Sequence, residues 1–204
     1  MTQQRTQKKE YTWDDLVAAI GQDFSGGEVT EAIETVDPSS IRKYCEPLEI
    51  DCPLYYDDEV ARKHGFKGVI APWSSFGAVS GNGFWKPADG EIWDSADPDH
   101  TIMGVGARPR PGSRQPIPLP MPETNGAFAT DIEIEYLRPV YLGDRLSRRG
   151  RKLVSVMLRE TRVGYGAFVV TESETMNQRG ELVSRSRNGS YSYIVGGKGP
   201  SKGA

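Results

Sequence analysis

The sequence predicts an α+β protein in which helices come first and an antiparallel sheet follows. Apolar residues recur at helical spacing in several segments before residue 86, whereas alternating and β-branched segments begin near residue 130. Between them, the proline-rich residues 86–125 exclude a helix or a central strand. Helices and strands that are segregated along the chain in this way are typical of the α+β class.

Composition and charge exclude several classes of function. The chain has 204 residues, of which 37% are apolar and 26% charged, as in an ordinary globular domain. A formal net charge of −3 gives no global field that would attract nucleic acid or an anionic membrane. We therefore expect no nucleic acid and no membrane as partner, and a small molecule or a protein instead.

The expected location is the cytoplasm. The N-terminus has no apolar stretch typical of a secretory signal, and no run approaches the roughly 20 apolar residues that span a bilayer. Cys45 and Cys52 lie outside the usual spacings of metal and redox pairs, and two cysteines do not indicate a disulfide scaffold. We expect one domain over residues 11–195, with disordered tails at 1–10 and 196–204.

The first predicted helix begins after Thr12, which can act as its N-cap. Four apolar residues follow helical spacing and are expected to form its buried face: Trp13, Leu16, Val17 and Ile20. Gly21 stands just past the expected end of the helix. Residues 31–37, "EAIETVD", alternate weakly and predict a strand.

Two more short helices are predicted before residue 66. Asp37 is an N-cap that precedes a proline at the first helical position, and this helix is expected to end at Glu46 because Pro47 disfavours helical angles there. Its expected buried residues are Ile41, Tyr44 and Cys45. The next helix is capped by Asp57 and ends at Gly65, with Val60 and Ala61 facing inward.

A longer helix is expected to begin at Pro72. Apolar and small residues recur at helical spacing from there: Trp73, Phe76, Gly77, Ser80, Gly81 and Phe84. Each glycine costs about 1 kcal/mol relative to alanine in a helix, so tertiary packing must hold this segment. The proline-rich insertion that follows is expected to run extended, as a lid or wall of a pocket.

Four strands are predicted in the last third of the chain. They cover residues 130–137, 152–158, 166–176 and 181–195. Residues 142–144 and 177–180 are predicted turns, the second with Gly180 in the left-handed region of a hairpin.

Three sequence blocks in this order resemble the MaoC-like dehydratases and hydratases, especially their N-terminal-dehydratase branch. The blocks are "SIRKYCEPLEIDCPLYYDDEVARKHGFKGVIAP", "IEIEYLRPVYLGDRL" and "TMNQRGELVSRSR", and the resemblance covers residues 28–194. It implies a single hot-dog fold, in which an antiparallel β-sheet wraps around a central α-helix, here the one that begins at Pro72. It also implies an acyl-CoA or acyl-carrier thioester as substrate, no cofactor, and a site at a dimer interface.

The two catalytic positions of that family are altered here. Catalytic members have an Asp and a His in a short motif around a proline, and the pair activates water for addition to a 2-enoyl double bond. With Pro53 as that proline, Ile50 takes the place of the Asp, Cys52 that of the usual Asn and Tyr55 that of the His. Isoleucine has no titratable proton, and a phenol with a reference pKa near 10 is a poor base at pH 7. The resemblance therefore implies no catalytic residue in this chain.

The resemblance leaves a substrate-binding role for several residues. The expected contacts are Tyr55, Pro72, Trp73 and Phe76, and the Trp73 N–H is the candidate oxyanion donor at the start of the central helix. Asp51 is one residue away from the catalytic position. In an extended segment this offset turns its side chain to the opposite face, so Asp51 is expected to be a turn or cap residue.

Other polar residues have a structural alternative beside a functional one. His64 is expected to favour a helix C-terminus, and neither it nor His100 has metal-ligand spacing to a second histidine. The five basic residues of 145–153 could meet the phosphates of coenzyme A or form a solvated strand end.

Three functions remain open on the sequence alone. Degenerate members of the family, active in fatty acid and steroid metabolism, pair with a catalytic hot-dog chain, and this chain would then be the non-catalytic, pocket-forming subunit of an enoyl-thioester hydratase. It could instead be a thioesterase that uses a carboxylate of residues 57–59, or a thioester-binding protein without turnover. The partner model predicts an exposed apolar edge strand or helix face.

Overall fold

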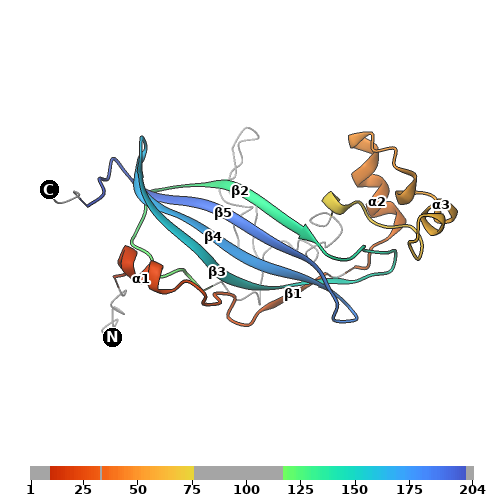
Figure 1. Ribbon diagram of the computed structural model, residues 1–204, viewed down its shortest axis with the longest axis horizontal. Helices are drawn as coiled ribbons and strands as arrows, with labels where there is room; N and C mark the ends of the chain where they lie inside the picture. The colour runs from red at the N-terminus through yellow and green to blue at the C-terminus, as the bar shows by residue number, and fades with distance from the viewer. Residues whose placement is uncertain (1–9, 33, 76–116, 201–204) are drawn as a thin grey trace, which may run out of the picture.

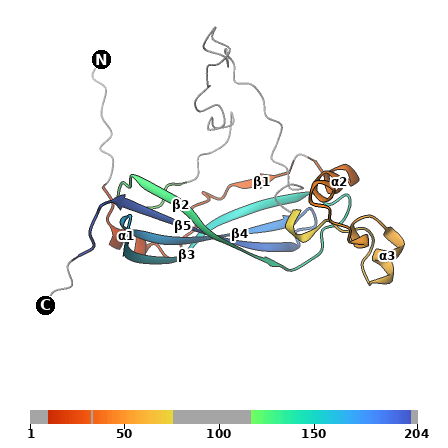
Figure 2. The ribbon, with the colours of Figure 1, turned by 90° about the horizontal axis from the view of Figure 1, so that it is seen from above.

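The computed structural model describes residues 10–32, 34–75 and 117–200, and shows short helices followed by an antiparallel sheet (Figure 1). Helix α1 (Trp13–Ala18) lies against one end of the sheet, and α2 (Pro38–Cys45) and α3 (Asp58–Lys63) lie at the other. Seen from above, the long strands run between these two ends (Figure 2). The predicted order of helices and strands is confirmed within the described residues.

Helix α1 begins at the predicted cap but buries a narrower face than expected. The Thr12 hydroxyl accepts a hydrogen bond from the Asp15 N–H, and the Asp15 carboxylate accepts one from the Thr12 N–H. Leu16 is fully buried, whereas Val17 and Ile20 are 40% and 43% exposed. The prediction for these two residues was wrong because the helix spans six residues and contacts the sheet through a single stripe.

The strand predicted over residues 31–37 is largely wrong. Strand β1 covers Val29–Glu31 and pairs with the start of β3 (Leu146–Thr161). After Glu31, two separate hydrogen bonds join the chain to the segment that begins β3. The Ala32 N–H donates to the Leu146 carbonyl and the Val36 N–H donates to the Asp144 carbonyl, both at 2.8 Å. The ladder stops because its partner strand begins at Leu146.

The caps of the next two helices are confirmed. The Asp37 carboxylate accepts hydrogen bonds at the start of α2, and the Asp57 carboxylate does so at the start of α3. Ile41, Cys45 and Ala61 are buried as predicted. Glu46 nevertheless keeps helical angles (φ −60°, ψ −47°), because a 3-10 turn over Glu46–Leu48 continues directly from α2.

The segment from Pro72 is described only at its start. A 3-10 turn covers Trp73–Ser75, where the Ser75 N–H and hydroxyl both donate to the Pro72 carbonyl, at 2.9 and 2.7 Å. The predicted helix from Phe76 onward and the predicted insertion up to residue 116 lie outside the described residues, as does His100. The last part of the insertion contributes Leu119 and Met121 to the packing beneath α1.

The described strands form one sheet of five, in the order β1-β3-β4-β5-β2, and every neighbouring pair is antiparallel. Strand β2 covers Gly126–Tyr136, β4 covers Gly164–Asn177 and β5 covers Leu182–Val195. The four predicted strands correspond to β2–β5, and β2 and β3 are several residues longer than predicted. Gly143 and Gly180 have φ values of 81° and 75°, which confirms both predicted turns.

Two apolar clusters stabilise the two ends of the sheet. The first joins α2 to the sheet through residues distant in sequence: Val36, Ile41, Cys45, Ala71, Val140, Leu146 and Val183. The second joins α1 to β3 and β4 through Leu16, Ala19, Phe24, Leu153, Ala167 and Val169. The first cluster supports the segment that contains the altered family motif.

Candidate acyl-binding site

Backbone hydrogen bonds place the altered motif beside Pro72. The Ile50 N–H donates to the carbonyl of Cys45 at the end of α2 (3.1 Å), and a 3-10 turn over Pro53–Tyr55 follows. The Ile70 N–H donates to the Leu54 carbonyl (3.2 Å), and the Ala71 N–H donates to the Val140 carbonyl (2.8 Å). Residues far apart in the sequence therefore form one wall.

This wall, called here the aromatic wall, is apolar and only partly buried. Its side chains pack against the first apolar cluster and comprise Tyr44, Ile50, Tyr55, Val69, Trp73 and Tyr136. The rings of Trp73 and Tyr136 are tilted at 52°, with centroids 5.4 Å apart. Pro72 is fully buried beside them. The structure thus brings together Tyr55 and Trp73, two of the four predicted contact residues, next to Pro72, while the fourth, Phe76, lies outside the described residues.

Tyr44 and Tyr136 belong to the wall although no motif identified them as site residues. Both had local signals of burial, since Tyr44 lies on the predicted inner face of a helix and Tyr136 on one face of an alternating strand. Their proximity depends on the packing of α2 against β2, which local patterns do not specify.

Two phenols of the aromatic wall, Tyr55 and Tyr136, have raised pKa values. Burial raises the pKa of Tyr55, and the neighbouring thiols of Cys52 and Cys45 raise it further. Burial also raises the pKa of Tyr136, with a smaller effect of Tyr44. A neutral phenol can donate a hydrogen bond to a carbonyl but is a poor base at neutral pH.

Raising the pH above 10 is expected to destabilise the folded chain, and Tyr55→Phe should reduce this effect. An unperturbed tyrosine has a pKa of 10.0, and the folded-state pKa of Tyr55 is higher. The contribution of Tyr55 to the free energy of unfolding is therefore fully present below pH 10. It is lost as the pH rises above 10, because the unfolded chain then releases a proton that the folded chain retains. Urea unfolding at about pH 8 and about pH 11 measures the difference. An identical pH dependence for both proteins would contradict the raised pKa of Tyr55 in the folded chain.

The neighbouring Tyr56 points to the backbone rather than into the wall. Its hydroxyl donates to the Ile50 carbonyl (2.6 Å). The pKa of Tyr56 is raised to about 12, mainly by its hydrogen bond with the Cys45 thiol and secondly by desolvation. The hydrogen bond to the Ile50 carbonyl fixes the turn that presents Ile50. Asp51, the nearest acid to the altered motif in sequence, is exposed.

Two of the three acidic candidates for a thioesterase, Asp57 and Asp58, are engaged at the start of α3. The Asp57 carboxylate accepts hydrogen bonds from the N–H groups of Glu59 and Val60, at 2.9 and 3.0 Å. Asp58 pairs with Arg62 (2.7 Å) and accepts a hydrogen bond from the Val69 N–H (3.2 Å). His64 is exposed at the end of the same helix, where its Nδ1 lies 2.8 Å from the Val60 carbonyl.

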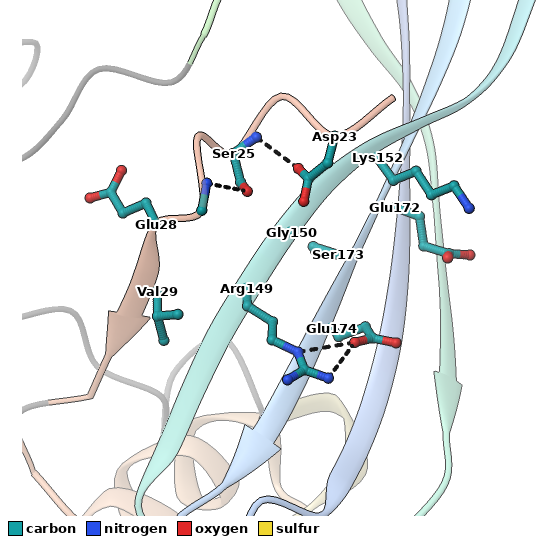
Figure 3. A pocket seen from close by; sticks show the side chains of 11 residues that line it. Asp23, Ser25, Glu28, Val29, Arg149, Gly150, Lys152, Glu172, Ser173 and Glu174 are labelled. Atoms are coloured by element: carbon teal, nitrogen blue, oxygen red, sulfur yellow. Dashed lines mark hydrogen bonds and ion pairs between the residues drawn. The ribbon is translucent and has the colours of Figure 1, made fainter. Parts of the chain in front are cut away.

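Arg149 and Lys152, two of the five basic residues of 145–153, line a polar pocket of about 470 Å³ that differs in character from the aromatic wall (Figure 3). Asp23 accepts hydrogen bonds there from the N–H groups of Ser25 and Arg151, which lower its pKa. Arg149 pairs with Glu174 (3.0 Å), and the Arg148 guanidinium donates to the Ser173 hydroxyl (3.1 Å). These partners favour the structural role of the basic segment over contact with coenzyme A.

No three His, Cys, Asp or Glu side chains in residues 10–32, 34–75 and 117–200 are grouped so that they could hold a metal ion. In the same ranges, every helix is too short or too polar to cross a bilayer.

Comparison with known proteins identifies the family. Residues 18–186 match the family model described as FAS1-like, dehydratase domain region. A curated protein of Thermomonospora curvata, described as a probable enoyl-CoA hydratase alpha subunit, is 26% identical over 174 residues. The match covers 84% of this chain and 49% of that protein, so the chain spans about half the length of this curated relative.

Solved structures share the fold at lower identity. The ChsH1–ChsH2 complex from Mycobacterium tuberculosis contains a chain with a TM-score of 0.60 and 19% identity, with 93% of both chains covered. The MaoC-like dehydratase from Rhodospirillum rubrum has a TM-score of 0.50 and 20% identity, with 82% of this chain and 92% of that chain covered. The sheet thus has hot-dog-like relatives. Because the family model matches most of its length, the chain belongs to the FAS1-like dehydratase family.

Proposed function

We propose that this chain is the non-catalytic, pocket-forming subunit of an enoyl-thioester hydratase or dehydratase, and that it acts with a catalytic MaoC-like chain. The observation on which the proposal rests is the pair of residues at the altered motif. Ile50 packs against an apolar cluster and has no proton to transfer, and Tyr55 is a neutral phenol that is a poor base for activating water.

The aromatic wall is suited to binding the acyl part of a thioester. Partly buried tyrosine and tryptophan rings provide a large apolar surface, and their polar atoms can orient a ligand. The neutral Tyr55 phenol could donate a hydrogen bond to the thioester carbonyl or an oxygen of the acyl group. The Asp and His that activate water are then supplied by the partner, and the oxyanion role of the Trp73 N–H stays a prediction.

The relatives support the same assignment. One is described as an alpha subunit of a probable enoyl-CoA hydratase, and another is part of a complex of two named components. We infer an acyl-CoA or acyl-carrier thioester as substrate, and water as the group that is added or removed. A central helix wrapped by the sheet is the arrangement that we propose for the segment from Pro72.

Hydration is expected only when this chain is combined with its catalytic partner. The chain is purified alone and together with any MaoC-like protein encoded beside it, and the loss of 2-enoyl-CoA absorbance is followed together with the release of free thiol. Hydration by the isolated chain would refute the non-catalytic assignment. Thiol release by the isolated chain would favour the thioesterase.

Two variants of the pair separate pocket formation from catalysis. Trp73→Ala removes a ring of the aromatic wall and is expected to raise KM about tenfold with a small change in kcat. Tyr55→Phe keeps the ring and removes the hydroxyl, so kcat should stay within about threefold, because a positioned proton donor or acceptor contributes about 100-fold or more. A loss of kcat of that size in Tyr55→Phe would show that Tyr55 moves a proton.

A further inference from the structure

Strand β2 forms one edge of the sheet that the described strands build (Figure 1). Among the described strands it pairs with β5 alone, so alternate backbone N–H and C=O groups point outward. Its regular part runs from Ile132 to Tyr136, after a register shift that begins at Ala129. Ile132 and Ile134 are 68% and 38% exposed, and the alternation of a strand places them on the same face. Such an edge is suited to pairing with another strand.

The opposite face of β2 begins a row of alternating charges that crosses the sheet. Glu135 lies opposite Arg185, which lies opposite Glu174, which lies opposite Arg149. Charged atoms of successive residues are 2.9, 3.8 and 3.0 Å apart. Four strands therefore contribute one residue each, in the order minus, plus, minus, plus.

A second row runs beside the first with the same order of signs. Glu133 lies opposite Arg187, which lies opposite Glu172, which lies opposite Lys152. The Arg187 guanidinium is 3.6 Å from Glu133 and 2.9 Å from Glu172. Both rows end at the open edge in a carboxylate, and the side chains of Glu133 and Glu135 are 69% and 55% exposed. A strand added beside β2 would continue the alternation if it presented cations there.

We propose that β2 pairs with a strand of a different polypeptide that has Lys or Arg opposite Glu133 and Glu135 and apolar residues opposite Ile132 and Ile134. The existence of a partner rests on the proposed function, whereas the charge rule rests on the edge itself. Opposite charges directly across two strands stabilise pairing, and like charges destabilise it. Since exposed ion pairs add little stability, we assign the two rows to the choice of partner.

The same pattern disfavours pairing of β2 with a second copy of itself. Any register that keeps the two isoleucines of both copies on one face places odd-numbered residues opposite odd-numbered residues. In the antiparallel registers centred on residues 132–135, at least one of Glu133 and Glu135 then faces an acidic residue of the other copy. A shift by one residue instead places carboxylates opposite isoleucines. The edge is therefore selective for a partner with basic residues.

Removal of the two charges tests the rule without an unknown partner. Sedimentation velocity is used to compare the unaltered chain with E133T/E135T, in which threonine preserves the preference for a strand. The variant should self-associate about tenfold more tightly than the unaltered chain, because the like-charge contacts are gone. Adding Ile134→Lys to this variant is the matched control and should abolish the gain.

Charge reversal gives an independent test. An equimolar mixture of the unaltered chain and E133K/E135K should form a one-to-one dimer, whereas each protein alone should not pair through β2. Ile134→Lys in either component should prevent this dimer. Circular dichroism and thermal unfolding of each variant establish that it is folded.

Three results would overturn the charge rule. They are self-association of the unaltered chain that Ile134→Lys removes, no gain in self-association of folded E133T/E135T, or no dimer in the mixture. None of these measurements uses enzyme activity. Failure of hydration by the pair of chains would overturn the proposed function alone, whereas a functional pair whose assembly is unaffected by E133K/E135K would overturn the charge rule alone.

Discussion

Replacing Tyr191 with alanine is expected to lower the free energy of unfolding by about 3–5 kcal/mol, the range measured for large-to-small changes of buried aromatic residues. Tyr191 is fully buried and stacks between the rings of Phe168 and Tyr193, with centroid distances of 4.3 and 5.1 Å. Its hydroxyl lies 2.8 Å from the carbonyl of Gly164 and 3.0 Å from that of Arg159. The truncation would therefore leave a cavity and break a hydrogen bond.

Urea unfolding measures this loss, and two control variants separate its causes. Tyr191→Phe removes the hydroxyl alone and should cost about 1–2 kcal/mol. Met157→Ala, on a side chain that is 56% exposed, should change stability by at most about 0.5 kcal/mol. If Tyr191→Ala and Met157→Ala had equal effects, the aromatic stack would not contribute to stability as described.

Replacing Asp144 with alanine is expected to cost about 3 kcal/mol, because one buried carboxylate joins two turns. Its side chain is 3% exposed and accepts hydrogen bonds from the Tyr141 N–H (3.0 Å), Gln178 (3.1 Å) and Arg179 (2.9 Å). Removal leaves the Tyr141 N–H without this partner and separates the turn before β3 from the hairpin between β4 and β5.

Glu181 provides the matched control for Asp144, because it also pairs with Arg179 at 2.9 Å but is 40% exposed. Glu181→Ala is expected to cost less than about 1 kcal/mol, as is usual for exposed pairs. Both variants are compared by urea unfolding at neutral pH. Equal losses would contradict the view that burial makes the Asp144 contacts strong.

The residues expected to stabilise the fold most and those of the candidate site differ in how deeply they are buried. Tyr191 and Asp144 are buried and hydrogen-bonded, whereas the side chains of the aromatic wall remain partly exposed. A partly exposed apolar surface has a cost in water that a ligand or a partner chain can remove. This difference is consistent with a wall that is completed on binding.

The sequence identified the features that depend on near neighbours. Asp37 and Asp57 cap helices because their carboxylates reach N–H groups two or three residues ahead, and Gly143 and Gly180 occupy turns that need positive φ. The family resemblance also predicted the lack of an Asp and His pair, because it places Ile50 and Tyr55 at those positions.

Tertiary structure decided which distant residues meet. The end of β1 depends on where β3 begins, the aromatic wall depends on the packing of α2 and residues 69–73 against the end of β2, and the charge rows depend on the register of four strands. None of these relations is encoded in a local pattern, because a shift of one residue in any strand would exchange its two faces without changing the pattern itself. The sequence by itself therefore determined the family and the caps, whereas the long-range packing determined the wall and the edge.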